Sequence, residues 1–319
     1  MGRRRKPPEG AQPIHGWLVL DKPLGLSSAA AVARVRHALK PFRIGHGGTL
    51  DPLATGVLPI ALGEATKTVS YVMDGVKTYV FTLRFGEARD SDDAEGAVVA
   101  TSDVRPETQQ IIDILPKFIG AVQQRPPAFS ALKVAGQRAY ALARAGKAPE
   151  MEERTIQINE LTLISRPDPE AVELAVICGK GTYVRALARD IAVMLGSVGH
   201  VAALRRTRVG PFDETQAIAL DNLMALGHSA PAFEYLLPIE TVLDDIPALA
   251  LTGDQAALIR QGCAVRLLGS GGVWPRDGEA GPPATLSDGS VVCVMEGTRL
   301  VALARIDAGA LRPVRVLNL

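Results

Sequence analysis

Cysteine and histidine are scarce in this chain of 319 residues. The three cysteines, Cys178, Cys263 and Cys293, lie far apart and form no C-x-x-C pair, so the sequence predicts neither a disulfide framework nor a structural zinc site. The histidines at positions 15, 37, 46, 200 and 228 show no metal-ligand spacing, which argues against metal-assisted hydrolysis. We therefore expect a metal-free protein of the reducing cytoplasm.

The chain also lacks a long uncharged apolar run and an excess of either charge. Its 35 Lys+Arg and 34 Asp+Glu residues leave a net charge of +1, so a polyanion-binding surface must arise from local clustering of basic residues. The basic residues 3–6 are followed by PPEG and not by the apolar stretch of a signal peptide. We expect no membrane span, and we expect residues 1–12 to form a disordered basic tail.

Signatures of several common catalytic designs are missing too. The sequence contains no G-x-S-x-G elbow, no catalytic-cysteine signature, no P-loop and no G-x-G-x-x-G motif after a strand. What remains is a carboxylate-centred mechanism without a cofactor, for which Asp51 is the candidate. Pro52 restricts Asp51 to extended backbone, and the glycines on both sides allow another backbone to approach closely. Taken alone, an aspartate in such a segment is more often a turn former.

Hydrophobic periodicity predicts strands over residues 16–20, 78–85 and 170–178 and a helix over residues 184–195 that stops at Gly196. Another helix should begin at Ser27 or Ser28, with its buried face formed by Ala29, Val32, Val35, Ala38 and Leu39. Residues 45–56 are rich in glycine and are predicted to be a loop, and the acidic residues 90–96 a solvated turn.

The hydrophobic pattern of the sequence changes after about residue 245. Short β-type runs at 264–268, 291–295 and 300–306 are separated by glycine-rich turns, which predicts a small β-rich domain. Residues 269–284 are dense in glycine and proline and should form a surface loop.

The run GHGGTLDPLATGVLP at residues 45–59 closely resembles the catalytic segment of bacterial tRNA pseudouridine-55 synthases, the TruB family. Further motifs accompany it in the family's order, at residues 15–28, 63–67, 77–79, 126–133 and 179–185. The resemblance covers roughly residues 14–245. Agreement at so many spaced motifs identifies the chain as a member of this family.

The resemblance implies an α+β fold with a large, mostly antiparallel or mixed sheet flanked by helices. Residues 13–245 would form the pseudouridine synthase catalytic domain and residues 246–319 a PUA-like RNA-binding domain. The implied activity is isomerisation of uridine 55 in the T-arm stem-loop of tRNA, by a monomer that needs no cofactor and no metal. Base flipping, which costs a few kcal/mol, would bring the target uridine out of the RNA.

The resemblance also implies roles for individual residues. Asp51 matches the catalytic aspartate, which attacks the uridine or its ribose while the C1′–N1 bond breaks, before the base rejoins through C5. Tyr79 matches the tyrosine that stacks on the extruded base, and Arg185 matches the arginine that pairs with the catalytic carboxylate.

Five further residues match positions with supporting roles. Tyr183 and Leu204 would line the base pocket, and His46 would fill the space that the extruded base leaves in the RNA. Lys22 and Lys67 would each either bind an RNA phosphate or support the active loop, which is the segment that carries Asp51. The resemblance favours neither role over the other. Arg205, Arg206 and Arg208 form a local basic cluster, which composition alone would assign to a solvated face.

Two other classes of function remain open at this point. The first is a non-catalytic tRNA-folding or RNA-binding protein, in which Asp51 would be incidental. The second is a carboxylate-based hydrolase of nucleosides or sugars, which would need a second carboxylate across the scissile bond. Asp21 and Asp90 are the candidates for that second group.

Overall fold

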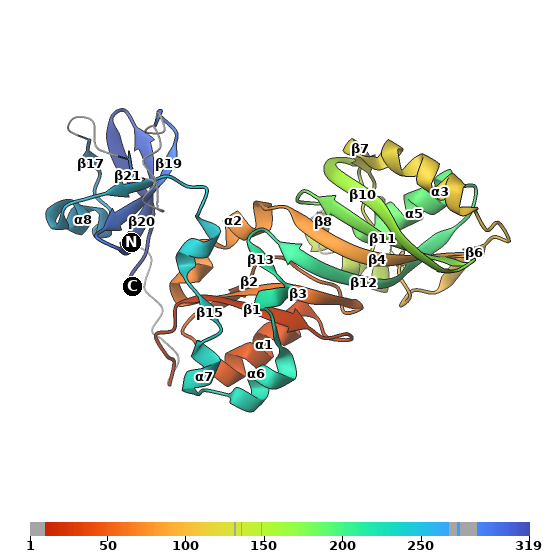
Figure 1. Cartoon of the computed structure of the whole chain (residues 1–319), viewed down its shortest axis with the longest axis horizontal. Coiled ribbons are helices and arrows are strands. Elements are labelled where there is room, and N and C mark those ends of the chain that lie inside the picture. The colour runs from red at the N-terminus through yellow and green to blue at the C-terminus, as the bar shows by residue number, and fades with distance from the viewer. Residues whose placement is uncertain (1–9, 131, 135, 148, 268–272, 275–285) are drawn as a thin grey trace.

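The computed structural model describes residues 10–130, 132–134, 136–147, 149–267, 273–274 and 286–319. Within them the larger sheet has eleven strands (Figure 1). Its main path runs β14-β1-β3-β12-β4-β11-β10-β7, while β2, β13 and β15 pair with β3, β12 and β1. These strands are β1 (Gly16–Lys22), β2 (Ile44–His46), β3 (Ala54–Leu62), β4 (Lys77–Phe85), β7 (Gly120–Gln124), β10 (Arg154–Asp168), β11 (Ala171–Cys178), β12 (Gly199–Val209), β13 (Phe212–Asp213), β14 (Ile218–Ala219) and β15 (Leu236–Leu237).

Most neighbours in this sheet are antiparallel, but β3 and β12 run parallel, with Leu204 opposite Ala54. On its other side β12 pairs antiparallel with β4, where Leu204 lies opposite Phe81. The strand β12 therefore joins β3 to β4. The expected large mixed sheet with flanking helices is confirmed, and β12 aligns the start of β3 with the middle of β4.

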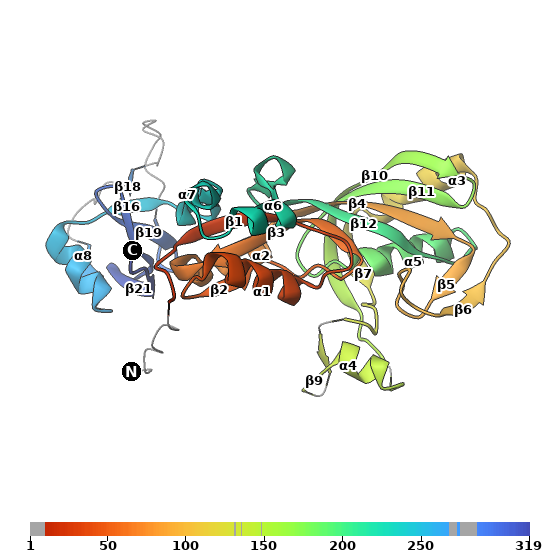
Figure 2. The same cartoon turned by 90° about the horizontal axis from the view of Figure 1, so that it is seen from below.

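Helices cover this sheet at two places (Figure 1). The helices are α1 (Ser28–Leu39), α2 (Val69–Asp74), α3 (Thr108–Ile114), α4 (Ala139–Arg144), α5 (Val184–Met194), α6 (Leu220–Leu226) and α7 (Ala230–Phe233), with short 3-10 turns η1 (Gly63–Lys67), η2 (Leu115–Phe118), η3 (Glu214–Gln216) and η4 (Ile239–Val242). One core combines α1 and α6 with β1 and β3, and another combines α5 with β4 and β11. Two small hairpins complete this part, β5 (Glu87–Arg89) with β6 (Val98–Thr101) and β8 (Lys133–Val134) with β9 (Gln137–Arg138). Figure 2 shows β9 and α4 projecting away from the sheet.

The first helix begins where the sequence predicted. Ser27 is its N-cap and accepts a hydrogen bond from the Ala30 amide. The predicted buried face was wrong at one position, because Ala29 is exposed and Ala31 is buried in its place. Val35, Ala38 and Leu39 are buried as expected and pack against β1 and β3.

The prediction of one loop over residues 45–56 was also wrong. The strand β2 extends to His46 and β3 begins at Ala54, so only residues 47–53 connect them. Gly56 belongs to β3, where its φ of +97° suits glycine and a Cβ atom would lie 2.2 Å from the Arg206 carbonyl oxygen. Glycine there serves the close approach of β3 and β12, not a flexible loop.

A second sheet follows at the end of the molecule opposite α3 (Figures 1 and 2). Its order is β17-β21-β20-β19-β16-β18, formed by β16 (Ala248–Ala250), β17 (Val265–Arg266), β18 (Val273–Trp274), β19 (Val291–Glu296), β20 (Arg299–Asp307) and β21 (Ala310–Val316), and α8 (Gly253–Arg260) packs on it. The two sheets are joined by a shared core, in which Trp17 and Val57 cluster with Leu303 and Leu317.

Two expectations fall largely outside the described residues. Of the predicted surface loop at 269–284, the structure describes only β18. Of the predicted tail it describes residues 10–12, where Gln12 forms a β-bridge with Pro41. No helix in the described part of the chain is long and apolar enough to cross a membrane.

Candidate active site

The connection between β2 and β3, residues 47–53, carries Asp51 and is held by backbone and side-chain hydrogen bonds. The Ser28 hydroxyl accepts from the Leu50 amide at 2.8 Å and donates to the Leu50 carbonyl at 2.9 Å. The Gly25 amide donates to the Pro52 carbonyl, and the Ala54 amide to the Asp51 carbonyl. The backbone on both sides of Asp51 is therefore fixed by partners from α1, the preceding turn and β3.

Two buried cations add to this support. The Lys22 ammonium donates to the carbonyls of Pro23 and Leu26 at 2.9 and 2.6 Å, with the Pro52 carbonyl at 3.4 Å. Lys22 is fully buried, and burial lowers its pKa to about 8 although the charge of Asp51 opposes the shift. These contacts fit support of the active loop and leave Lys22 no access to an RNA phosphate.

Arg206 is the second cation, and the prediction of a solvated basic face was wrong for it. Its side chain is buried in the middle of the sheet, where Nε donates to the Val57 carbonyl at 2.8 Å and Nη2 to the Gly48 carbonyl at 3.0 Å. Arg205, its neighbour, points away and pairs with Asp21 at 3.1 Å. Because successive side chains of a strand point to opposite faces of the sheet, the two arginines lie on opposite sides of β12.

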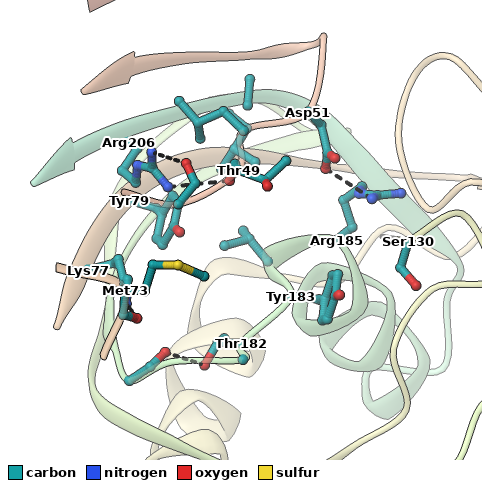
Figure 3. A pocket seen from close by; sticks show the side chains of 17 residues that line it. Thr49, Asp51, Met73, Lys77, Tyr79, Ser130, Thr182, Tyr183, Arg185 and Arg206 are labelled. Carbon is teal, nitrogen blue, oxygen red and sulfur yellow. Dashed lines mark hydrogen bonds and ion pairs between the residues drawn. The ribbon is translucent and has the colours of Figure 1, made fainter. Parts of the chain in front are cut away.

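Arg185, in the first turn of α5, forms an ion pair with Asp51 at 2.9 Å between Nη2 and Oδ2 (Figure 3). The arginine side chain is only 5% exposed, whereas that of Asp51 is 40% exposed. Behind the pair, Arg185 Nη1 lies 3.4 Å from Asp93 Oδ2 and donates to the Ser91 carbonyl at 2.7 Å. Arg185 Nη2 also donates to the Phe129 carbonyl. A guanidinium fixed on all sides thus holds the rotamer of one accessible carboxylate.

The prediction of a solvated turn at residues 90–96 was wrong for Asp92 and Asp93, whereas Asp90 and Glu95 are exposed as expected. Asp92 and Asp93 are buried because they pair with arginines one helical turn apart on α5: Asp93 with Arg185, and Asp92 with Arg189 at 2.8 Å. Burial nevertheless raises the pKa of Asp92 to about 6, so desolvation outweighs the attraction of Arg189.

A cavity of about 280 Å³ opens beside Asp51 (Figure 3). The structure brings five of the eight predicted site residues to it: Asp51, Tyr79, Tyr183, Arg185 and Leu204. They come from the active loop, β4, the start of α5 and β12, which meet because β12 lies between β3 and β4. Burial raises the pKa of both Tyr79 and Tyr183, so both phenols are neutral at pH 7.

Two family models match consecutive parts of the chain. Residues 36–184 match the family model described as TruB family pseudouridylate synthase, N-terminal domain. Residues 185–244 match the one described as tRNA pseudouridylate synthase B C-terminal domain. The chain belongs to the TruB family. It is therefore a pseudouridine synthase, an isomerase, as its motifs predicted.

Individual relatives extend the likeness over the whole chain. The tRNA pseudouridine synthase B of Rhodospirillum rubrum is 51% identical over 319 residues, which is the full length of both chains. That of Gluconacetobacter diazotrophicus is 53% identical over 96% of this chain and 98% of its own. Among solved structures, a chain of the Cbf5-Nop10-Gar1 complex superposes with a TM-score of 0.69 and 27% identity, covering 95% of this chain and 84% of that one. The fold expected for the TruB family is confirmed.

Three predicted site residues do not line the cavity. Lys22 supports the loop from behind, and His46 lies at the end of β2, where burial lowers its pKa and leaves the ring neutral at pH 7. Lys67 pairs with Glu64 at 2.5 Å and donates to the Val316 carbonyl at 2.6 Å. Lys67 therefore links η1 to β21 of the second sheet. This position does not support a role in holding the active loop or in binding an RNA phosphate.

Other cavity-lining residues received no role from the sequence. Lys77, Ser130 and Thr182 stand in motifs that resemble those of the TruB family, at residues 77–79, 126–133 and 179–185, and this signal could have identified them. Arg206 belongs to the basic cluster noted in the sequence. Met73 also lines the cavity, and nothing local in the sequence marks it.

A hydrolase would need a second carboxylate in the cavity, and the described residues that line it supply none. Asp21 is held by Arg205 and lies outside the cavity. Asp90 also lies outside it; with Asp51 it lines a second cavity of about 220 Å³, where it accepts a hydrogen bond from the Ala97 amide. Among the described residues that line the first cavity, Asp51 is the one carboxylate. Hydrolysis of a glycosidic bond ordinarily uses two that face each other.

Proposed function

We propose that this protein converts uridine 55 in the T loop of tRNA to pseudouridine, with Asp51 as the carboxylate that attacks the substrate. The observation that carries the proposal is the accessible Asp51 carboxylate, held by buried Arg185 at the mouth of a cavity that also contains Tyr79. The motif at residues 45–59 and the names of the two relatives support tRNA as the substrate.

The target base would be flipped out of the T loop, at a cost of a few kcal/mol, and enter the cavity. Stacking on the neutral Tyr79 ring, with contacts to Tyr183 and Leu204, would offset this cost. His46, partly exposed at the end of β2, would fill the vacated space in the RNA.

Asp51 would attack the ribose or the base as the C1′–N1 bond breaks, and Arg185 holds the carboxylate in place. A new bond then joins C1′ to C5, the C5 proton is lost and N1 gains a proton. Atoms and electrons balance without an oxidant, a metal or a cofactor, so the reaction is a pure isomerisation.

The second sheet would act as a PUA-like RNA-binding domain over residues 246–319, appended to the catalytic domain of residues 13–245. Its own apolar core and the arginines at positions 305 and 312, beside a shallow groove, fit a surface for the RNA backbone. One chain supplies Asp51, Tyr79 and Arg185, so the reaction needs no second copy, and we propose that the protein works as a monomer in the cytoplasm.

The test is to incubate the wild-type protein with an unmodified tRNA transcript, without a cofactor, and to map pseudouridine along the RNA. We expect pseudouridine at position 55 and none in a matched transcript with cytidine at that position. Tight binding without product would favour the tRNA-folding alternative instead. Release of free uracil would favour the hydrolase.

A further inference from the structure

Two buried cations line the cavity on the side facing Asp51 and Arg185 (Figure 3). Lys77, the first residue of β4, donates from its ammonium to the carbonyls of Met73 and Gly75 at the end of α2. Arg206 donates to the carbonyls of Gly48 and Val57, as described above. In the described part of the chain neither forms an ion pair with a carboxylate.

Buried charges without a counter-ion are costly, because backbone carbonyls replace only part of the lost hydration. Burial and the neighbouring Arg206 charge both lower the pKa of Lys77, which shows that the two cations act on each other. If their task were only to hold backbone carbonyls, neutral donors would do so at less cost. The pair of charges thus indicates an anion that reaches the cavity.

The charges around the cavity do not cancel. Lys77, Arg185 and Arg206 line it together with the single carboxylate of Asp51. Behind the lining, Asp93 pairs with Arg185 and the buried Lys22 supports the active loop. Four cations against two carboxylates leave an excess of positive charge. A neutral uracil base entering the cavity would not use this charge, but an anionic form of the base would.

We propose that Arg206, assisted by Lys77, stabilises the negative charge on the uracil ring after its bond to the ribose breaks. This inference rests on the proposed function. Heterolysis of the C1′–N1 bond leaves its electron pair on N1, from which the charge spreads to the ring oxygens. A fixed cation next to that ring lowers the barrier because its charge is needed most when the bond is broken.

The location of Arg206 fits this role. Its guanidinium lies beside Tyr79, the proposed stacking partner of the base, and its charge opposes the rise in the pKa of Tyr79 that burial causes. Its hydrogen bonds to the Gly48 and Thr49 carbonyls keep it rigid, so little reorganisation accompanies the reaction. The cation that holds the active loop would therefore also face the departing base.

The experiment compares variants that keep the charge with variants that remove it. Arg206→Lys and Arg206→Gln both lose the forked contacts to the loop, but only Arg206→Gln loses the charge. Lys77→Arg and Lys77→Gln form the second pair, in case the first position does not tolerate change. Arg205→Gln is the matched control, because Arg205 lies next to Arg206 on β12 and points away from the cavity. Each protein is assayed with a T-arm stem-loop RNA for its dissociation constant and its single-turnover rate of pseudouridine formation.

We expect Arg206→Gln to slow the single-turnover step by about 10²–10³-fold while the dissociation constant changes little. Arg206→Lys should retain a rate within about tenfold of the wild type, and the Lys77 pair should show the same order with smaller losses. Equal losses for the lysine and glutamine variants would overturn the proposal and leave Arg206 a loop support. Weaker RNA binding at an unchanged rate would also overturn it and assign the charge to an RNA phosphate. A wild-type protein that forms no pseudouridine would instead refute the proposed function.

Discussion

Ser28 and Leu50 share two hydrogen bonds, one in each direction, between the first residue of α1 and the residue before Asp51. One hydroxyl thereby satisfies both polar groups of a buried backbone unit. The position of the Asp51 carboxylate, which we propose to attack the substrate, depends on this contact, although Ser28 does not line the cavity.

Ser28→Ala should lower both stability and activity. The two Leu50 groups lose their partner, which costs about 1–3 kcal/mol in the free energy of unfolding, and misplacement of Asp51 should slow isomerisation by about ten- to a hundredfold. Urea denaturation and single-turnover kinetics measure the two effects. The neighbouring Ser27→Ala is the control, because it removes only the N-cap contact to Ala30, at a cost of about 1 kcal/mol. An equal rate loss in both variants would count against the role given to Ser28.

Gly56→Ala should destabilise the junction of β3 and β12. The added Cβ would lie 2.2 Å from the Arg206 carbonyl oxygen, at a φ of +97°. We expect a loss of about 2–4 kcal/mol in the free energy of unfolding. Gly45→Ala is the matched control in β2, since nothing lies within 4 Å of its Cβ position. If thermal or urea unfolding finds the two variants equally stable, the close approach of the strands is not as described.

The pH dependence of stability should contain a contribution from Asp92. Its pKa is raised from 3.8 to about 6, so the folded protein holds this proton more tightly than the unfolded chain. The resulting stabilisation is fully present below about pH 4 and is lost as the pH rises through about 6, with a size of up to roughly 3 kcal/mol. Asp92→Asn should flatten the curve of unfolding free energy against pH in this window. Parallel curves for variant and wild type would refute the assignment.

Much of the fold followed from local pattern. Alternation predicted β4 and β11, and helical spacing predicted α1, with a capping serine, and α5, which ends before Gly196. These signals depend on neighbours in sequence. The prediction of one loop over the glycine-rich residues 45–56 was wrong, because Gly56 belongs to β3. It allows the close approach of β12, a strand about 150 residues away in the sequence.

The candidate site, too, was only partly predictable from the sequence. The motifs that resemble those of the TruB family pointed to Asp51, Tyr79 and Arg185, which the structure brings to one cavity. Burial of Asp93 and Arg206 was not predictable from the sequence, because their partners, Arg185 for Asp93 and backbone carbonyls for Arg206, come from distant segments. Composition alone assigns such residues to the solvent.

The rate of pseudouridine formation by Asp51→Asn, at position 55 of a tRNA transcript and beside the wild type, tests the central claim most directly. The substitution keeps the size of the side chain and removes its charge, and RNA binding measured in parallel shows whether the site stays intact. The account predicts tRNA binding close to that of the wild type and no detectable pseudouridine. Pseudouridine formation at the wild-type rate by the variant would contradict it.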